Sequence, residues 1–272
     1  MKIALMDSGI GLLAAAAAVR RLRPDADLVL SSDPDGMPWG PRTPESLTGR
    51  ALDVARAAAG HRPDALIVAC NTASVHALPA LRAALEPGIP VIGTVPAIKP
   101  AAARGGGRVA IWATPATTGS PYQRGLIGEF AAGARVTEVP CPGLADAVEA
   151  ADATAVTAAV AAAAALTPTD TTDVVLGCTH YELVETAIRT ALAARTGGDG
   201  FVFHGSAEAV AGQALRRIGA RPEPALPATG SLTVLHSGRP GALPGAALGY
   251  AEGRLLAGGS PAADPAAAAL LR

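Results

Sequence analysis

The chain has few lysines, few cysteines and almost no net charge. A net charge of −1 excludes the basic surface that nucleic acids and anionic membranes require. Three cysteines, an odd number in a long chain, argue against a disulfide framework and fit the reducing cytoplasm. The two lysines, Lys2 and Lys99, lie outside every motif described below, so neither is placed to form a Schiff base with pyridoxal phosphate.

Long hydrophobic runs are also absent from the sequence. The Ala-rich stretch 155–166 stops before Pro168 and is too short to span a bilayer. Near the N-terminus, Asp7, Ser8 and Gly9 interrupt the apolar run, which is not typical of a signal peptide. We therefore expect a cytoplasmic protein without membrane or nucleic-acid partners. We expect no metal site either, because the cysteines and histidines lack the spacings of zinc ligands.

Short β-rich segments alternate with longer Ala- and Leu-rich segments, which predicts βαβ units and parallel sheets covered by helices on both faces. Strands are expected at 2–6, 27–32, 65–69, 91–95, 108–113, 135–139, 173–177 and 200–204. Helices are expected at about 10–23, 44–60, 73–86, 115–132, 152–166, 181–195 and 206–219. The Pro- and Gly-rich segment 87–108 predicts a hinge between two similar α/β domains. These domains would be 1–96 plus about 206–256, and 97–205, with 257–272 as a mobile tail.

Polar clusters follow three of the predicted strands at the point where each strand ends. They are Asp7-Ser8-Gly9, Cys70-Asn71-Thr72 and Cys178-Thr179-His180. Loops after two further strands add Pro38-Trp39-Gly40 and the segment 114–118. Sites in open parallel sheets form beyond the carboxyl ends of the strands, so we expect these clusters to converge on an active site in one cleft between the two domains.

Cys70 and Cys178 stand in matching contexts, each between a buried strand and the start of a helix. One free cysteine is usually a small buried hydrophobe, but two at strand ends, where backbone N–H groups favour the thiolate, indicate chemistry. Two thiols on opposite sides of one carbon suit a racemase. One thiolate removes the α-proton, and the opposite thiol returns a proton to the other face. Asp7 and His180 would keep the two sulfurs in opposite protonation states. Cys141, in VPCPG, lacks such neighbours and is interpreted as structural.

Hydroxyl and amide groups at the strand ends could hold the carboxylates of a substrate. They belong to Ser8, Asn71, Thr72, Thr117 and Thr179. Glu149 follows a strand and the turn PCPG, and it becomes a candidate only if it faces the same cleft.

A different class of enzyme is also open, because Gly9, Gly11 and Ala14 form a GxGxxA loop between a strand and a helix. Asp33 ends the next strand, where an acid would bind a ribose. A nicotinamide-dependent oxidoreductase would leave both cysteine motifs unexplained, and the Asp7 carboxylate would repel a pyrophosphate. The same loop could also be a simple helix-capping turn, and the chain a non-catalytic interaction protein.

Four motifs together resemble the glutamate racemase family, within the cofactor-independent aspartate/glutamate racemase superfamily. They are DSGIG, VACNTAS, ATPAT and GCTHY, and the resemblance runs from residue 1 to about 215, and more weakly to about 255. It implies two α/β domains with the site between them, often in homodimers. It also implies racemisation of free L- and D-glutamate without a cofactor, which supplies D-glutamate for peptidoglycan.

Carried over by motif, Cys70 and Cys178 are the catalytic acid/bases, Asp7 and His180 assist them, and Glu149 matches a family acid. The implied substrate contacts are Asp7, Ser8, Trp39, Gly40, Asn71, Thr72, Thr117, Thr179 and His180. The departures are Leu12 for a glycine of DSGxGG, Trp39 for the tyrosine of PYG, His204-Gly205 for Asp-Ser, and Glu182 for a proline. A racemase of another amino acid, in specialised metabolism, therefore stays open as an alternative.

Overall fold

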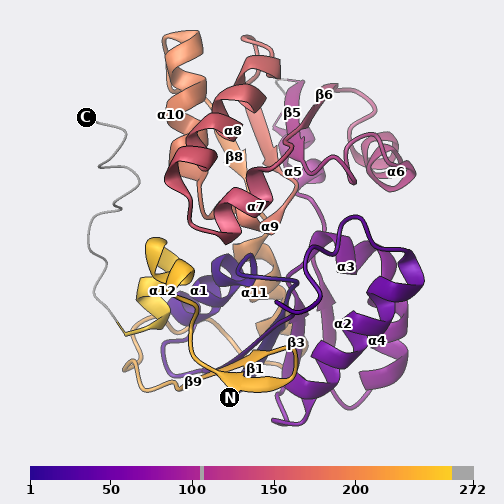
Figure 1. The fold of residues 1–272 in the computed structure, drawn as a ribbon, viewed down its shortest axis with the longest axis vertical. Helices are drawn as coiled ribbons and strands as arrows, with labels where there is room; N and C mark the ends of the chain where they lie inside the picture. Colours follow the sequence, from indigo (N-terminus) through magenta and orange to yellow (C-terminus); the bar gives the residue numbers. More distant parts are fainter. Residues whose placement is uncertain (105–106, 259–272) are drawn as a thin grey trace. The chain divides into compact units, whose positions relative to one another are not determined.

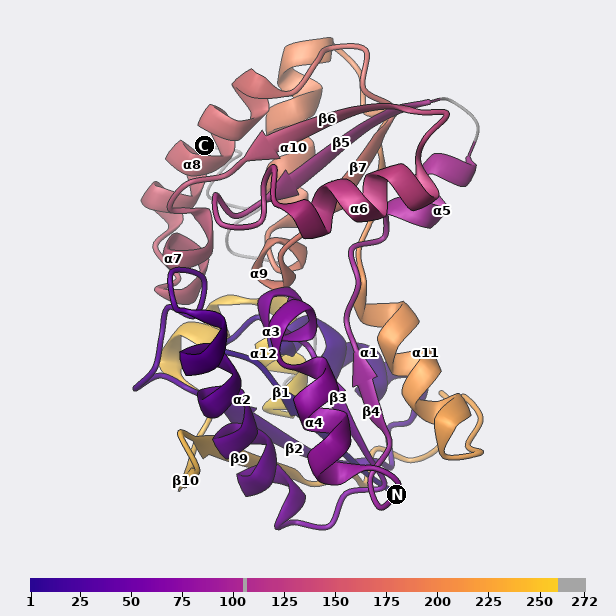
Figure 2. The same ribbon diagram turned by 90° about the vertical axis from the view of Figure 1, so that its right-hand side faces the viewer.

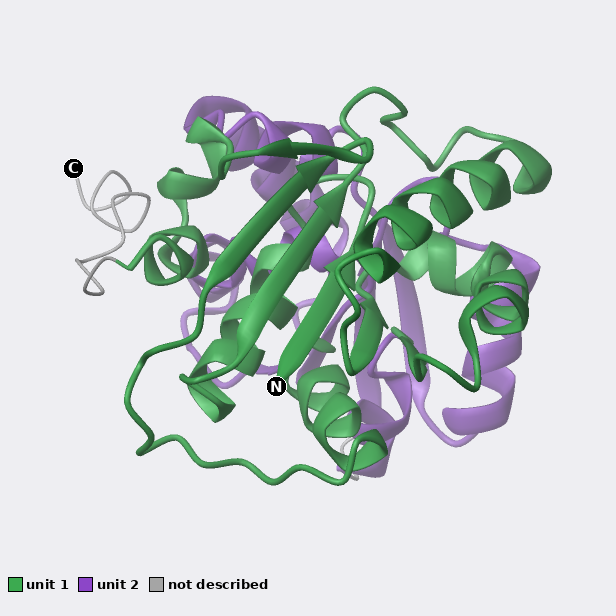
Figure 3. Ribbon diagram, turned by 90° about the horizontal axis from the view of Figure 1, so that it is seen from below, with its two compact units in different colours: residues 1–95, 206–262 green, residues 96–205, 263–272 purple. Residues whose placement is uncertain are grey.

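The structure, a computed structural model, describes residues 1–104 and 107–258, which divide into two compact units (Figure 3). Unit 1 comprises Met1–Val95 and the described residues from Ser206 onward, and unit 2 runs from Pro96 to Gly205. Each unit is built on its own sheet of mainly parallel strands with helices on both faces, which confirms the predicted α/β class. From residue 259 onward, the expected mobile tail lies outside the described residues.

Unit 1 has a six-stranded sheet in the order β10-β9-β2-β1-β3-β4. All neighbours pair in parallel except β10, which is antiparallel to β9. The central strands are buried on both faces, which explains their continuous apolar runs. The strands are β1 (Lys2–Met6), β2 (Asp27–Ser32), β3 (Ala65–Val68), β4 (Val91–Gly93), β9 (Leu232–His236) and β10 (Arg239–Gly241).

Helices of unit 1 cover both faces of this sheet. Helix α2 packs on β1 and β2 with α3 and α4 beside it, whereas α1 packs with α11 and α12 on the other face (Figure 2). The core between the sheet and α2 includes Met6, Trp39 and Leu47. The helices are α1 (Leu12–Leu22), α2 (Pro44–Ala59), α3 (Asn71–His76), α4 (Leu78–Leu85), α11 (Ala207–Arg217), α12 (Ala251–Leu256) and the 3-10 helix η1 (Gly245–Gly249).

Unit 2 has a four-stranded, wholly parallel sheet in the order β6-β5-β7-β8. Helices α5 and α6 lie on one face, and α7, α8 and α10 lie on the other (Figure 1). The strands are β5 (Arg108–Ala113), β6 (Arg135–Pro140), β7 (Asp173–Leu176) and β8 (Val202–His204). The helices are α5 (Ile98–Ala103), α6 (Pro121–Phe130), α7 (Leu144–Glu149), α8 (Ala153–Leu166), α9 (Thr179–Glu182) and α10 (Glu185–Thr196).

The eight predicted strands are all present, with ends shifted by at most two residues. Several helices differ from the prediction. The one expected over 73–86 is two helices that meet at Ala77, because Pro79 has no N–H to continue the hydrogen-bond ladder. The one expected over 115–132 begins only at Pro121, after the Ser120 cap. The helix expected over 181–195 is also two helices, α9 and α10.

Segment 87–108, expected as a hinge, holds β4 and α5, and its residues 105 and 106 lie outside the described residues. Strands β9 and β10 and helices α5, α7 and α12 were not predicted. Within the part of the chain that the structure describes, no helix combines the length and apolar character needed to cross a membrane.

Candidate active site

In unit 1, Cys70 and Asp7 stand at the ends of two neighbouring strands. Strands β1 and β3 pair in register from Ile3 to Met6, and the Ala69 N–H donates to the Met6 carbonyl at 2.8 Å. The next residue on each strand is therefore Asp7 and Cys70. Both are buried, at 0% and 6% exposure. The Asp7 carboxylate accepts the Ser8 N–H at 2.6 Å, which fixes its orientation.

Cys70 is the residue from which α3 starts, with extended backbone angles of −98° and 121°. Its carbonyl accepts the Ser74 N–H at 2.9 Å, so the change from strand to helix takes place at the thiol itself. Asn71 and Thr72 form the first turn of this helix, Asn71 buried and Thr72 half-buried. The structure thus brings together the unit 1 residues that the sequence predicted at two strand ends.

In unit 2, Cys178, His180 and Glu149 form one hydrogen-bonded chain. His180 Nε2 lies 2.9 Å from Glu149 Oε2, and His180 Nδ1 lies 3.8 Å from Cys178 Sγ. Cys178 directly precedes α9, His180 lies within α9, and Glu149 is the last residue of α7. The sequence separates Glu149 from the other two residues, and packing of α7 against α9 brings them together.

The direction of proton transfer along this chain follows from the chemistry of its groups. A carboxylate only accepts hydrogen bonds, so Glu149 requires the hydrogen of a neutral His180 to reside on Nε2. In that tautomer Nδ1 carries the acceptor lone pair, and it lies 3.8 Å from the Cys178 sulfur. His180 can therefore take the proton of the thiol at Nδ1, and the Glu149 carboxylate stabilises the imidazolium that forms.

Gly177 allows the Cys178 backbone to approach the neighbouring strand closely. Its N–H donates to the Trp112 carbonyl at 2.7 Å, and a Cβ on this residue would stand 2.8 Å from the same oxygen. The loop after β5 begins at Thr114, whose Oγ1 donates to Thr117 Oγ1 at 3.2 Å. Only a glycine therefore fits at the strand end that delivers this thiol.

Cys141 follows β6 and differs from the other two cysteines in its surroundings. Its side chain is 1% exposed, and burial raises the pKa of its thiol to about 12. The thiol therefore stays protonated at neutral pH, and its S–H contacts the Val139 carbonyl at 3.4 Å. This environment agrees with the structural role expected for Cys141.

Trp39, which the motif predicts as a substrate contact, is a buried residue of unit 1. Its side chain is 2% exposed and belongs to the core of unit 1, where the indole N–H donates to Asp33 Oδ2 at 2.9 Å. The half-buried Gly40 follows it, and Ser8 is likewise half-buried. The Trp39 ring is therefore an internal anchor of its loop.

The acid required by the dinucleotide hypothesis is already engaged. Asp33 accepts hydrogen bonds from Trp39, Arg50 and Ser237, so its carboxylate oxygens are not available for a ribose. Neither Arg50 nor Ser237 carried any signal in the sequence. These partners of Asp33 could be found only from the folded structure.

Two departures from the family motif lie in unit 2. His204 Nε2 is 2.7 Å from the buried Asp173 carboxylate, which also receives Arg104 at 3.1 Å. A Cβ on Gly205 would meet the Glu182 carboxylate at 2.5 Å, so the small residue leaves room for the side chain that replaces a proline. The glycine at position 205 and the glutamate at position 182 are therefore sterically compatible with each other.

In residues 1–104 and 107–258, no group of three His, Cys, Asp or Glu side chains could hold a metal ion. The candidate titratable groups form one set in each unit, Asp7 with Cys70 in unit 1, and Glu149 with His180 and Cys178 in unit 2. Each set places a thiol and a group able to accept a proton at the ends of parallel strands, an arrangement that suits acid–base chemistry.

Proteins of this construction are found among the racemases. The model of the Asp/Glu/Hydantoin racemase family matches residues 11–212, so the chain belongs to this family. Among its relatives, the glutamate racemase of Roseiflexus sp. (strain RS-1) is 38% identical over 193 residues, which cover 69% of this chain and 70% of the relative. The glutamate racemase of Pseudomonas entomophila (strain L48) is 36% identical over 225 residues, covering 80% and 82%.

Solved structures give the same family. The crystal structure of Escherichia coli glutamate racemase, in complex with L-glutamate and the activator UDP-MurNAc-ala, has a TM-score of 0.74 to this chain. The identity is 26%, and the match covers 91% of both chains. These findings confirm the resemblance drawn from the four motifs.

Proposed function

We propose that this chain interconverts L- and D-glutamate by a two-thiol 1,1-proton transfer, with Cys70 and Cys178 as the acid/base pair. The observation that carries the proposal is the chain Glu149–His180–Cys178, which equips one thiol to lose its proton. The Asp7 carboxylate, at the neighbouring strand end, is the corresponding group for Cys70. Glutamate as the substrate is supported by the glutamate racemases that the chain resembles.

In this mechanism the two thiols exchange protonation states during each turnover. For one enantiomer, the Cys178 thiolate takes the α-proton, and the electron pair of the C–H bond passes to the α-carbon and its carboxylate. The Cys70 thiol then gives its proton to the opposite face of that carbon and becomes a thiolate. For the other enantiomer, the roles are reversed. Both steps conserve charge and require no oxidant.

The substrate carboxylates need hydrogen-bond donors close to the two thiols. We infer that these come from the polar side chains at the strand ends and from the backbone around Gly40. The side chains are those of Ser8, Asn71, Thr72, Thr117 and Thr179. Because neutral hydroxyls and amides leave the α-proton weakly acidic, the site must position the thiols closely and hold the developing negative charge.

The positions of the two lysines support a mechanism without pyridoxal phosphate. Lys2 begins β1, at the strand end opposite Asp7, and its ammonium donates to the His61 carbonyl at 3.0 Å. The Lys99 ammonium lies 5.6 Å from the centre of the Phe130 ring. Neither ammonium is at the carboxyl end of a strand, where the thiols are.

We further infer that the enzyme works in the cytoplasm as a homodimer and supplies D-glutamate for peptidoglycan, as its family membership implies. Sedimentation velocity of the purified chain tests the dimer. Depletion of the protein in a cell that lacks other sources of D-glutamate tests the role, because growth should then depend on added D-glutamate. Growth that is unaffected by depletion would contradict this role.

The substrate proposal is tested by following the optical activity of purified enzyme with L-glutamate, L-aspartate and other amino acids, without added cofactor. We expect L-glutamate to racemise and the others to react much more slowly. Cys70→Ala and Cys178→Ala should be inactive, and Cys141→Ala, which also removes a thiol, should remain active as the matched control. Racemisation of another amino acid in place of glutamate would overturn the substrate assignment and keep the two-thiol chemistry.

A further inference from the structure

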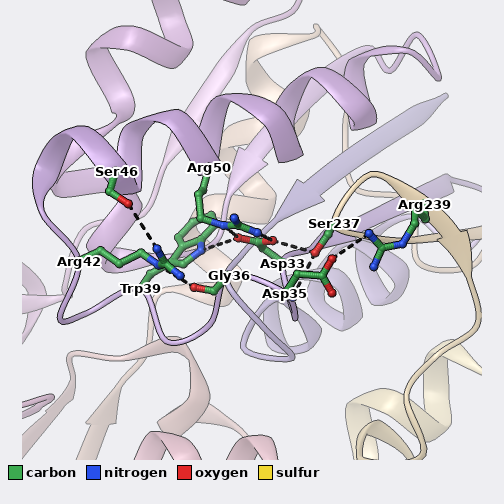
Figure 4. Close-up of polar contacts among 9 residues, drawn as sticks. All are labelled: Asp33, Asp35, Gly36, Trp39, Arg42, Ser46, Arg50, Ser237 and Arg239. Carbon is green, nitrogen blue, oxygen red and sulfur yellow. Dashed lines mark hydrogen bonds and ion pairs between the residues drawn. The ribbon is translucent and has the colours of Figure 1, made fainter.

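Asp33, immediately after β2, is a buried carboxylate that receives four side-chain hydrogen bonds (Figure 4). Its side chain is 1% exposed, and the Arg50 guanidinium donates to its two oxygens at 2.5 and 2.6 Å. The Trp39 indole donates to Oδ2 at 2.9 Å, and the Ser237 hydroxyl donates to Oδ1 at 2.8 Å. The two oxygens of a carboxylate offer about four acceptor sites, so this one is fully occupied.

The loop between β2 and α2 is built around this carboxylate. Gly36 N–H donates to the Asp33 carbonyl at 3.0 Å, and Arg42 Nε donates to the Gly36 carbonyl at 2.7 Å. A Cβ on Gly36 would collide with the Arg50 guanidinium and the Asp33 carboxylate, so the loop backbone lies directly against the ion pair. Trp39 lies in the sequence between Gly36 and Arg42, and it inserts its large side chain into the core of unit 1.

Ser237 reaches Asp33 from the turn between β9 and β10. Its φ is +46° and that of Gly238 is +80°, as in two-residue hairpin turns with positive φ at both positions. A serine in this region is uncommon, and strained residues persist where the surrounding structure holds them. Here the Ser237 hydroxyl donates to Asp33 and also accepts the Asp35 N–H at 3.2 Å, so the hairpin completes the anchor.

We propose that Asp33 is a positioning residue of the racemase, which fixes the Trp39 indole and through it the Pro38–Gly40 segment that contacts the substrate. The inference rests on the proposed function, which supplies the contact between this segment and glutamate. In the family motif a tyrosine stands at this position, and here the indole N–H provides the polar donor that Asp33 accepts. Trp39 therefore acts on the substrate through the order of its loop.

The charge of Asp33 makes this anchor persistent. Burial raises the pKa of Asp33, but hydrogen bonds from Arg50, Trp39 and Ser237 outweigh it and hold the pKa below its usual range. The group is thus a carboxylate, a stronger acceptor than a neutral group, throughout the neutral pH range.

The same contacts could serve stability alone, and the two roles predict different behaviour. A purely structural ion pair would change the free energy of unfolding and leave the KM of the folded enzyme unaltered. A positioning residue raises KM for glutamate while kcat changes little, since the proton-transfer groups are elsewhere. The effect of Asp33→Asn on KM should also disappear in a Trp39→Phe background, where no indole N–H is present to donate to residue 33.

The test compares Asp33→Asn, Trp39→Phe and the double variant, with Asp35→Asn as the matched control. Asp35 belongs to the same loop and pairs with Arg239 at 2.8 Å, but its half-exposed carboxylate does not contact Trp39. We expect Asp33→Asn and Trp39→Phe each to raise KM for glutamate about tenfold, the factor corresponding to one lost charge-assisted hydrogen bond. The double variant should resemble Trp39→Phe alone, and Asp35→Asn should resemble the wild type.

A spectroscopic measurement makes the test independent of activity. The chain has two tryptophans, so the enzyme labelled with 5-fluorotryptophan gives two ¹⁹F signals, which Trp39→Phe assigns. Asp33→Asn should shift or broaden the Trp39 signal and leave that of Trp112, whose indole donates to Thr167 at 3.0 Å, unchanged. Trp39→Phe keeps the Asp33–Arg50–Ser237 contacts, so it tests the proposal even if Asp33→Asn does not fold.

Two outcomes would overturn the inference. One is an unchanged KM in folded Asp33→Asn, whether or not the Trp39 signal shifts, and the other is a double variant whose KM effect is the product of the single effects. A failure of the proposed function is distinguishable, because a wild-type enzyme that does not racemise glutamate would still report the Trp39 position by ¹⁹F.

Discussion

Glu149→Gln is the substitution that most sharply tests the proposed proton relay of unit 2. It keeps the size of the side chain and removes the charge that lies 2.9 Å from His180 Nε2. A hydrogen bond to a charged group contributes about 1.5–3 kcal/mol, and this stabilisation is lost where the imidazolium forms. Each 1.36 kcal/mol is a factor of ten in rate, so kcat/KM should fall roughly 10- to 150-fold.

The assay follows racemisation of L- and D-glutamate separately by circular dichroism. Because the enantiomers have equal free energies, kcat/KM should fall by the same factor in both directions. Glu185→Gln is the control, since it makes the same chemical change in a half-exposed carboxylate paired with Arg189 at 3.0 Å, and it should keep full activity. A loss of less than twofold in Glu149→Gln, with Cys178→Ser inactive, would refute the relay.

Three further predictions concern stability. Arg50→Gln leaves the buried Asp33 carboxylate without its ion-pair partner and should lower the free energy of unfolding, measured in urea at pH 7, by about 3–5 kcal/mol. Asp33→Asn should lower it less, because the guanidinium that it leaves unpaired is 33% exposed to water. The reverse order of the two losses would contradict this reasoning. The folded pKa of Asp33 is lowered, so its contribution is complete above the unfolded value of about 3.9 and is lost as pH falls through the folded pKa. The stability difference between wild type and Asp33→Asn should therefore shrink only below about pH 4, and a decline starting at neutral pH would refute this. Gly177→Ala should lower both Tm and kcat, because the added Cβ would stand 2.8 Å from the Trp112 carbonyl oxygen. Gly128→Ala, in open space on α6, should instead stabilise the chain by about 0.5–1 kcal/mol. Equal changes of Tm in the two variants would contradict this difference in packing.

The sequence was sufficient for the parallel strands β1 to β8 and for the thiols that follow two of them. Buried parallel strands such as 65–68 and 173–176 are continuous apolar runs, and each is followed by a cysteine with polar neighbours. The hydrophobic pattern of a strand and the position where the strand ends depend on neighbouring residues, so both can be read from the sequence. The family motifs extended this local information to the racemase family, which the comparisons confirm.

Local patterns did not reveal the contacts between segments distant in the chain. The hairpin β9–β10 is short and lies at the sheet edge, so its strands carry a weak periodic signal, yet it brings Ser237 to Asp33 across 204 positions of sequence. The burial of Trp39 was hidden for the same reason, because its motif predicts a loop and only packing against α2 places the ring in the core. The break between α3 and α4 at Ala77 is due to Pro79. This proline is a local signal, but the Ala- and Leu-rich pattern around it led to the prediction of one continuous helix.

The most direct test of the central claim, that two thiols act on opposite faces of one carbon, is early-time proton NMR and mass spectrometry in D₂O. The thiol that donates to the product has already exchanged with solvent. From L-glutamate we therefore expect D-glutamate deuterated at Cα while the remaining L-glutamate keeps its protium, and the converse from D-glutamate. Cys70→Ser and Cys178→Ser should each abolish inversion. Deuterium that enters substrate and product equally from the start, or inversion that survives in either serine variant, would contradict the two-thiol mechanism.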